Sequence, residues 1–310
     1  MKKVLLVALT HQNAFRLARL IWAARTQFPA NLDVHGMVVC NSTDPSYAAQ
    51  AQQVAQQFNW MFRETTSNGM PGKGKNSVLD IFSKMDGYDY LFLVDGDDFL
   101  YPTAFQQIEQ LLRIGADVVG FLTNDIIDNV LYKDQKREPL TSDLYLYSWF
   151  DDQVRWPAKP ELTSKLDLSQ PLGQQTTPDR IVLLSKKAAV LLRCSEKLPV
   201  YEDYVLSLRA KAAMLRGELS YVQSGTTYAY VYDKTNDNSV CKQFDREYSG
   251  NWSSHDLVFR EELGDDLILL LKSSPLDVPF VEINHPKAFD TNGKIQFLRY
   301  VLSDQFNTAK

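Results

Sequence analysis

The sequence is short of cysteine, of net positive charge and of long apolar runs, and each shortage excludes a class of protein. Its 310 residues contain three cysteines, Cys40, Cys194 and Cys241, with no CxxC spacing. This argues against structural zinc and a disulfide framework and favours a reducing compartment. The net charge of -5 argues against binding along a nucleic-acid backbone, which needs clustered lysine and arginine. With no run near the ~20 apolar residues of a membrane span, we expect a cytoplasmic protein that has no nucleic-acid partner and no transmembrane segment.

The amino-terminal part of the chain alternates short apolar runs with helical patterns. Strands are predicted at 4–10, 34–40, 60–63, 90–94 and 117–122, and helices at 13–27, 45–58, 76–85 and 103–113. Strands separated by helices of this length predict an α/β protein with a mainly parallel central sheet covered on both faces. Ligands of such sheets bind at the carboxyl ends of the strands, and Thr10, Asn41 and Asp44 follow the first two strands.

The pattern becomes irregular over residues 124–175 and regular again after them. Strands are predicted at 181–184, 219–223 and 227–232, and helices at 187–193, 201–216, 257–272 and 294–302. The chain shows no internal repeat and no clear linker. One domain with an insertion and a helical carboxyl-terminal extension is therefore favoured over two domains.

An acidic cluster follows the apolar run at 90–94. Asp95, Asp97 and Asp98 lie within four positions, with Gly96 between the first two. Alternate residues of an extended chain point the same way, so Asp95 and Asp97 can converge on one cation. A hard divalent ion such as Mg2+ or Mn2+ suits these oxygen ligands and leaves positions for substrate phosphates. The alternative is an Asp-Gly turn that caps the next helix.

Two further segments carry candidate residues. Residues 69–76 combine three glycines with Lys73 and Lys75, a composition that can bring backbone N–H groups and positive charge to an anion at a helix amino terminus. The alternative is an ordinary flexible connection with solvated lysines. Glu202 and Asp203 begin a helical pattern, where acids commonly complement the helix dipole. The functional alternative is that one of the two carboxylates accepts a proton from an incoming hydroxyl.

Together these segments resemble the GT-A fold glycosyltransferases of the family 2 type. The resemblance rests on Lys75-Asn76, on Asp95-Gly96-Asp97-Asp98 and on Glu202-Asp203, in that order, and covers roughly residues 3–232. It implies the GT-A, or nucleotide-diphospho-sugar transferase, fold over residues 1–253, with the insertion at 124–175. Residues 254–310 would then form the helical extension packed on this domain.

The resemblance also implies a role for each candidate residue. The predicted catalytic residues are Asp203, as the base, and Glu202, near the acceptor. The predicted donor-binding residues lie beside the base, the phosphates, the ribose or the sugar, and they are Thr10, Asn41, Asp44, Lys73, Lys75, Asp95 and Gly96. The predicted metal ligands are Asp97, Asp98 and Asp233, of which Asp233 (or its neighbour Tyr232) stands where many relatives have a histidine.

The implied activity is a metal-dependent transfer of sugar from a UDP- or GDP-linked donor to a carbohydrate or glycan hydroxyl, with inversion and with Mn2+ or Mg2+ as cofactor. The aromatic segment 145–156 would stack on sugar faces or pack the insertion onto the domain. Alternatives are a non-catalytic nucleotide-sugar-binding module, a phosphatase of the haloacid dehalogenase type, and a sugar nucleotidyltransferase. The phosphatase normally has its Asp-x-Asp after the first strand, and the nucleotidyltransferase a Gly-rich loop there. The sequence does not indicate an oligomeric state.

Overall fold

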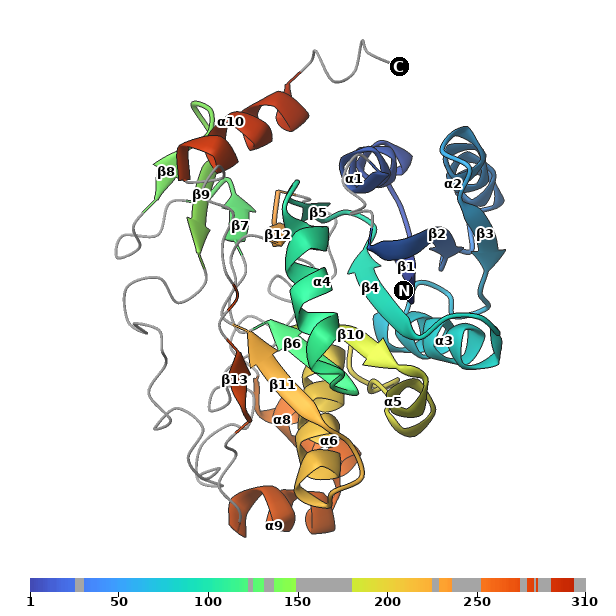
Figure 1. Ribbon diagram of the computed structural model, residues 1–310, viewed down its shortest axis with the longest axis vertical. Helices are drawn as coiled ribbons and strands as arrows, with labels where there is room; N and C mark the ends of the chain where they lie inside the picture. Colours follow the sequence, from blue (N-terminus) through green and yellow to red (C-terminus); the bar gives the residue numbers. More distant parts are fainter. Residues whose placement is uncertain are drawn as a thin grey trace.

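The computed structural model describes residues 1–25, 31–121, 125–130, 137–148, 180–224, 229–235, 252–273, 278–281, 283 and 291–303. An eight-stranded sheet forms its centre, in the order β13-β11-β6-β10-β4-β1-β2-β3 (Figure 1). The strands are β1 (Lys2–Thr10), β2 (Leu32–Cys40), β3 (Met61–Glu64), β4 (Tyr90–Asp95), β6 (Val118–Phe121), β10 (Arg180–Ser185), β11 (Tyr221–Ser224) and β13 (Phe280–Val281). Only β10 runs antiparallel to its neighbours in this sheet. The predicted mainly parallel sheet is confirmed.

Helices cover both faces of this sheet because its inner strands carry apolar side chains on both faces. Val4 and Leu6 of β1 pack against α1 (Ala14–Arg25), α2 (Pro45–Gln57) and α4 (Ala104–Ile114). Leu5 and Val7 face the opposite way, toward α3 (Pro71–Lys84), α5 (Lys186–Leu191) and α6 (Glu202–Leu215). A strand buried on both faces reads as a continuous apolar run, which is how residues 4–9 appear in the sequence.

A second sheet of short strands lies beside the first. Its order is β5-β12-β7-β9-β8, formed by β5 (Phe99–Leu100), β7 (Asp125–Asp128), β8 (Glu138–Pro139), β9 (Tyr145–Ser148) and β12 (Tyr230–Asp233). The sequence indicated no strands between 124 and 175, because strands of two to four residues are too short to show a period. Of the aromatic segment 145–156, only residues 145–148 are among those described.

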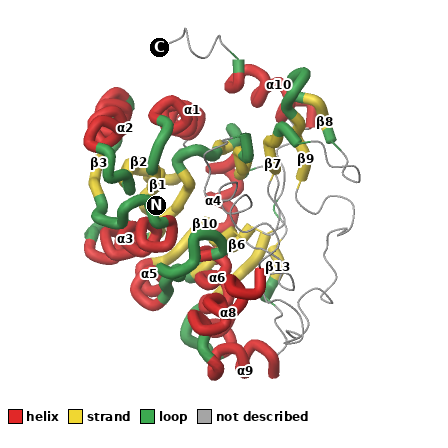
Figure 2. The backbone as a smooth tube through the Cα atoms, turned by 180° about the vertical axis from the view of Figure 1, so that it is seen from behind, coloured by secondary structure: helices red, strands yellow, loops and turns green. Residues whose placement is uncertain are grey.

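The carboxyl-terminal helices pack in two separate places (Figures 1 and 2). Helices α8 (Trp252–Leu263) and α9 (Asp265–Ser273) pack on α6, whereas α10 (Thr291–Leu302) packs on the second sheet. The predicted helical extension is confirmed, but β13 also adds a strand to the central sheet. Within the described ranges, no helix combines the length and the apolar character that crossing a membrane requires.

Candidate active site

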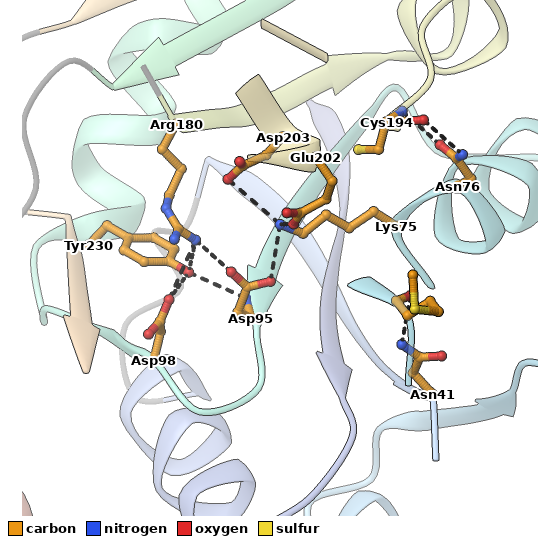
Figure 3. A network of polar contacts seen from close by, with 11 residues as sticks. Asn41, Lys75, Asn76, Asp95, Asp98, Arg180, Cys194, Glu202, Asp203 and Tyr230 are labelled. Atoms are coloured by element: carbon orange, nitrogen blue, oxygen red, sulfur yellow. Dashed lines mark hydrogen bonds and ion pairs between the residues drawn. The ribbon is translucent and has the colours of Figure 1, made fainter. Parts of the chain in front are cut away.

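The candidate site lies where β4 ends and where α3, α6, β10 and β12 begin. Figure 3 shows Lys75, Asp95, Arg180, Glu202 and Asp203 in one network of polar contacts. Three of these residues come from the first turns of helices, one from the carboxyl end of the parallel strand β4, and one from the start of the antiparallel strand β10. This edge of the sheet is the one predicted from the order of the elements.

Lys75 is the centre of one half of the network. Its Nζ atom lies 2.7 Å from Oε1 of Glu202, and 3.7 Å from both Oδ1 of Asp95 and Oδ2 of Asp203. Burial disfavours the charged amine, but the carboxylates of Asp95, Glu202 and Asp203 outweigh it and hold the pKa of Lys75 well above its ordinary value. The ammonium group is thus a permanent counter-charge for three acids, two of which are predicted catalytic residues.

The two acids of α6 differ in their access to solvent. The Glu202 side chain is 8% exposed and that of Asp203 is 39% exposed. Burial raises the pKa of Glu202, although the nearby charge of Lys75 opposes this. Asp203 is therefore the carboxylate that an incoming molecule can reach, while Glu202 fixes the helix end.

The backbone just before these acids is strained. Tyr201 has a φ of 64°, a left-handed conformation that is uncommon for a bulky residue and costs free energy. Its ring packs edge-on against Tyr204 with a centroid separation of 5.8 Å. The surrounding structure thus enforces the turn that directs Glu202 toward Lys75.

Helix α3 is fixed tightly against the segment that precedes α6. Asn76 donates to the carbonyl of Cys194 (3.2 Å) and accepts from its N–H group (2.8 Å). A Cβ atom at Gly72 would lie 1.7 Å from the carbonyl oxygen of Ser195, so only glycine permits this approach.

Residues 71–76 are the first turns of α3 rather than a loop, which corrects the predicted helix start at residue 76. Pro71 explains the earlier start because proline suits the first helical position.

The predicted donor-binding lysines therefore differ in their surroundings. Lys75 is buried among acids, whereas Lys73 is exposed on the same helix. Gly96 follows β4, and a Cβ atom there would lie 2.7 Å from Cβ of Thr10. The absence of a side chain at Gly96 therefore allows the turn after β4 to approach the end of β1.

The ends of β1 and β2 are held by internal hydrogen bonds. The Thr10 hydroxyl bonds to the hydroxyl of Tyr47. Oδ1 of Asn41 accepts from the hydroxyl groups of Thr65 and Ser67, and its Nδ2 donates to the carbonyl of Met70 at 3.2 Å. These bonds hold the side chains of Thr10 and Asn41 in place, and their contact with a nucleotide base stays a prediction.

Asp44 is exposed and caps α2, since its carboxylate accepts from the N–H of Ser46 at 2.9 Å. A capping role of this kind is common for aspartate before a helix. Its proximity to a bound nucleotide also stays a prediction.

Arg180 is the centre of the other half of the network. Its Nη1 atom donates to Oδ2 of Asp95 at 2.9 Å, lies 3.4 Å from Oδ2 of Asp98 and donates to the Tyr230 hydroxyl. Tyr230 in turn donates to Asp98. Burial disfavours the charge, but the surrounding anionic groups hold the pKa of Arg180 well above its ordinary value. Arg180 and Tyr230 were not predicted as site residues, because a single arginine or tyrosine in a strand carries no signal of this convergence.

Asp233 is held by a second pair of arginines. Nη1 of Arg16 and Nη2 of Arg19 each lie 2.8 Å from Oδ2 of Asp233, and Nη2 of Arg16 donates to Thr235 at 2.8 Å. Both arginines come from α1, one turn apart, and neither was predicted as a site residue. Their shared contact draws the end of β12 onto α1.

The predicted metal ligands do not form a cluster. Among the residues that the structure describes, no group of three His, Cys, Asp or Glu side chains is arranged to hold a metal ion. Asp98 faces Arg180, and Asp233 faces Arg16 and Arg19. Asp97 differs, since burial and the charges of Asp95 and Asp233 raise its pKa. The ligand roles of Asp97, Asp98 and Asp233 therefore stay predictions, and in this structure Asp98 and Asp233 face arginine side chains.

Comparison with known proteins identifies the fold. Residues 1–349 of TarS from S. aureus in complex with UDP-GlcNAc match with a TM-score of 0.50 and 14% identity, covering 78% of this chain and 61% of that chain. The UDP complex of TarS 1–349 has a TM-score of 0.48 and 13% identity, covering 99% and 92%. Glucosyl-3-phosphoglycerate synthase from Mycobacterium tuberculosis with UDP has a TM-score of 0.44 and 13% identity, covering 72% and 70%.

No family model matches the sequence, and neither does any curated protein. The match to TarS 1–349 with UDP-GlcNAc covers 61% of that chain, which is less than two thirds of its length. At this identity the likeness concerns the fold alone. The fold expected from the sequence, the GT-A glycosyltransferase fold, is confirmed.

Proposed function

We propose that this protein is a glycosyltransferase that moves a sugar from a nucleoside-diphosphate sugar to a hydroxyl group of a carbohydrate or glycan. One observation carries the proposal. Lys75 holds Asp203, from α6, and Asp95, from the end of β4, each 3.7 Å from its ammonium nitrogen. A reachable carboxylate thus lies beside the strand end at which ligands of α/β sheets bind.

In the proposed reaction Asp203 is the general base. It takes the proton of the acceptor hydroxyl while that oxygen attacks the anomeric carbon from the face opposite the diphosphate. The bond from the anomeric carbon to the phosphate oxygen breaks, its electron pair leaves with the nucleoside diphosphate, and the configuration inverts. A positioned base contributes typically ~10²–10⁴-fold to such a step. Glu202 stays paired with Lys75 and orients the helix end that carries Asp203.

A UDP-linked sugar is the first donor to test, because the TarS structure contains UDP-GlcNAc; a GDP-linked sugar is the alternative. Asp95 and Gly96 would face the ribose or donor sugar. Thr10, Asn41 and Asp44 would lie near the base, and Lys73 and Lys75 near the base or the phosphates. Of these residues, Asp44 and Lys73 have exposed side chains, and Lys75 would act through its pairing with the acids.

A divalent ion, Mn2+ or Mg2+, belongs to the proposal. Burial and then the charges of Asp95 and Asp233 raise the pKa of Asp97, although the charge of Arg16 opposes this, and a bound cation would favour the ionised form of the carboxylate. Asp97 would hold the ion together with phosphate oxygens of the donor, since Mg2+ commonly combines one or two carboxylates with substrate phosphates. When bound, the ion stabilises the negative charge of the departing diphosphate.

The test is calorimetry with UDP and GDP, with and without Mn2+, followed by a hydrolysis assay over a panel of nucleotide sugars. Metal-dependent binding of one nucleotide with slow release of its sugar supports the transferase. Binding with no turnover of any donor, in the presence of candidate acceptors, would favour a non-catalytic nucleotide-sugar-binding module. Phosphate release from sugar phosphates without nucleotide binding would favour a phosphatase and overturn the proposal.

A further inference from the structure

The guanidinium group of Arg180 lies between two carboxylates of the acidic cluster (Figure 3). Nη1 is 2.9 Å from Oδ2 of Asp95 and 3.4 Å from Oδ2 of Asp98. Its Cζ atom lies 4.2 Å from the centre of the Tyr230 ring, a distance typical of a cation–π contact. The arginine side chain is 18% exposed and that of Asp98 is fully buried. Arg180 is therefore packed into the cluster rather than resting on its surface.

Both oxygens of Asp98 are engaged inside the protein. Oδ2 accepts from Tyr230 and faces Arg180, while Oδ1 accepts from the backbone N–H of Asp233 at 3.0 Å. A divalent ion needs free oxygen ligands at about 2.0–2.6 Å. It would have to displace these partners, and the fixed positive charge of Arg180 repels it at short range.

We propose that Arg180 is the built-in counter-cation of this cluster, which excludes a divalent ion from Asp95 and Asp98 and confines metal binding to Asp97. Since Asp97 is a single carboxylate, the ion there needs further oxygen ligands from a diphosphate. The protein alone then binds Mn2+ weakly, and Mn2+ and a nucleoside diphosphate bind together. This inference deepens the proposed function and rests on it only for the source of the phosphate oxygens.

Asp233 provides an independent parallel at the same edge of the site. Its carboxylate is shared by Arg16 and Arg19 at 2.8 Å each, so two of the three predicted metal ligands already face arginine. Arginine suits this task because it keeps its charge when buried and presents several donors to carboxylates.

The first experiment titrates Mn2+ into the nucleotide-free protein and follows the free ion by electron paramagnetic resonance. We expect weak binding by the wild type and at least ~10-fold tighter binding by Arg180→Gln, because a repelling unit charge has been removed. Arg180→Lys keeps the charge and should bind as weakly as the wild type. Arg193→Gln, which breaks the ion pair with Asp80 on the surface, is the matched control and should also be unchanged. Tight Mn2+ binding by the wild type, or no gain in a folded Arg180→Gln protein, would overturn the inference.

A second pair of variants decides the question if Arg180→Gln does not fold. With UDP present, Asp97→Asn should abolish the binding of Mn2+, whereas Asp98→Asn should retain it. Loss of Mn2+ binding in Asp98→Asn, with its circular dichroism unchanged, would show that Asp98 is a ligand and refute the inference. If the wild type binds no UDP under any condition, the proposed function fails, while the nucleotide-free titration still decides the role of Arg180.

Discussion

The Nζ atom of Lys75 and the Oε1 atom of Glu202 lie 2.7 Å apart, although 127 positions separate the two residues in the sequence. Both side chains are at least nine-tenths buried. The pair joins the first turns of α3 and α6, and through the neighbouring contacts it also positions Asp95 and Asp203. One buried cation thus sets the relative places of the strand-end aspartate and the proposed base.

Replacing Lys75 by methionine should destabilise the protein strongly. Removal of one partner from a buried ion pair leaves an uncompensated charge and costs ~3–5 kcal/mol. Urea unfolding at pH 7 measures the loss. Lys73→Met, on the exposed side of the same helix, is the matched control and should change the free energy of unfolding by less than ~0.5 kcal/mol. Equal effects of the two substitutions would contradict the structural role assigned to Lys75.

Asp203→Asn should lower the rate of sugar transfer ~10²–10⁴-fold while leaving the affinity for the nucleotide unchanged, because a general base acts in the transition state. The measurement is kcat with the donor identified in the panel, alongside calorimetry with the corresponding nucleotide. Asp266→Asn, an exposed acid at the start of α9, controls for the loss of one carboxylate. Transfer by Asp203→Asn at the wild-type rate would remove Asp203 from its proposed role.

Gly72→Ala should cost about 3 kcal/mol or more of stability, at or above the upper end for overpacked sites. The added Cβ would lie 1.7 Å from a backbone oxygen of Ser195, which cannot move aside as a flexible side chain can. Gly87→Ala is the comparison, since Gly87 has a φ of 85° but no atom within 4 Å of the added Cβ. That variant should lose only the ~1–2 kcal/mol of a left-handed backbone. Thermal unfolding of both variants tests whether crowding or backbone strain dominates.

Asp117→Asn should destabilise the protein at pH 7 and have a much smaller effect in acid. Asp117 accepts hydrogen bonds from Ser185 and from the backbone and hydroxyl of Ser220 at 2.8–3.0 Å. Burial alone would raise the pKa of this carboxyl, but these hydrogen bonds outweigh it and lower the pKa. Because the folded-state pKa lies below the unfolded one, the stabilisation is present above the ordinary value of ~3.9 and is lost as the pH falls through the folded-state pKa.

We expect a loss of ~1.5–3 kcal/mol at pH 7, the range for hydrogen bonds to charged groups. Urea unfolding at pH 7 and near pH 3 would measure it. A loss that stays constant over this pH range would show that the carboxylate charge is not what stabilises these strand ends.

Much of the central sheet could be predicted from the sequence because its signals are local. The apolar runs that predict β1 and β2, and the helical period that predicts α1, each lie within a window of about ten residues. Local hydrophobic periodicity is therefore enough to indicate these elements. Of the second sheet, only the strand at 227–232, which overlaps β12, was predicted, since β5 and β8 contain two residues each and exist only through pairing with distant strands. Its shortest members acquire their structure from partners that no local pattern indicates.

The candidate side chains of the site could be recognised from local sequence. Lys75, the acids at 95–98 and Glu202-Asp203 stand out by residue type and by their places at element ends, and all were named without coordinates. Their pairing became visible in the folded chain: Lys75 with three acids, Arg180 with Asp95 and Asp98, and two arginines with Asp233. The physical reason is that a side chain's type is local, whereas its counter-ion is set by which chain segments the sheet brings to one edge.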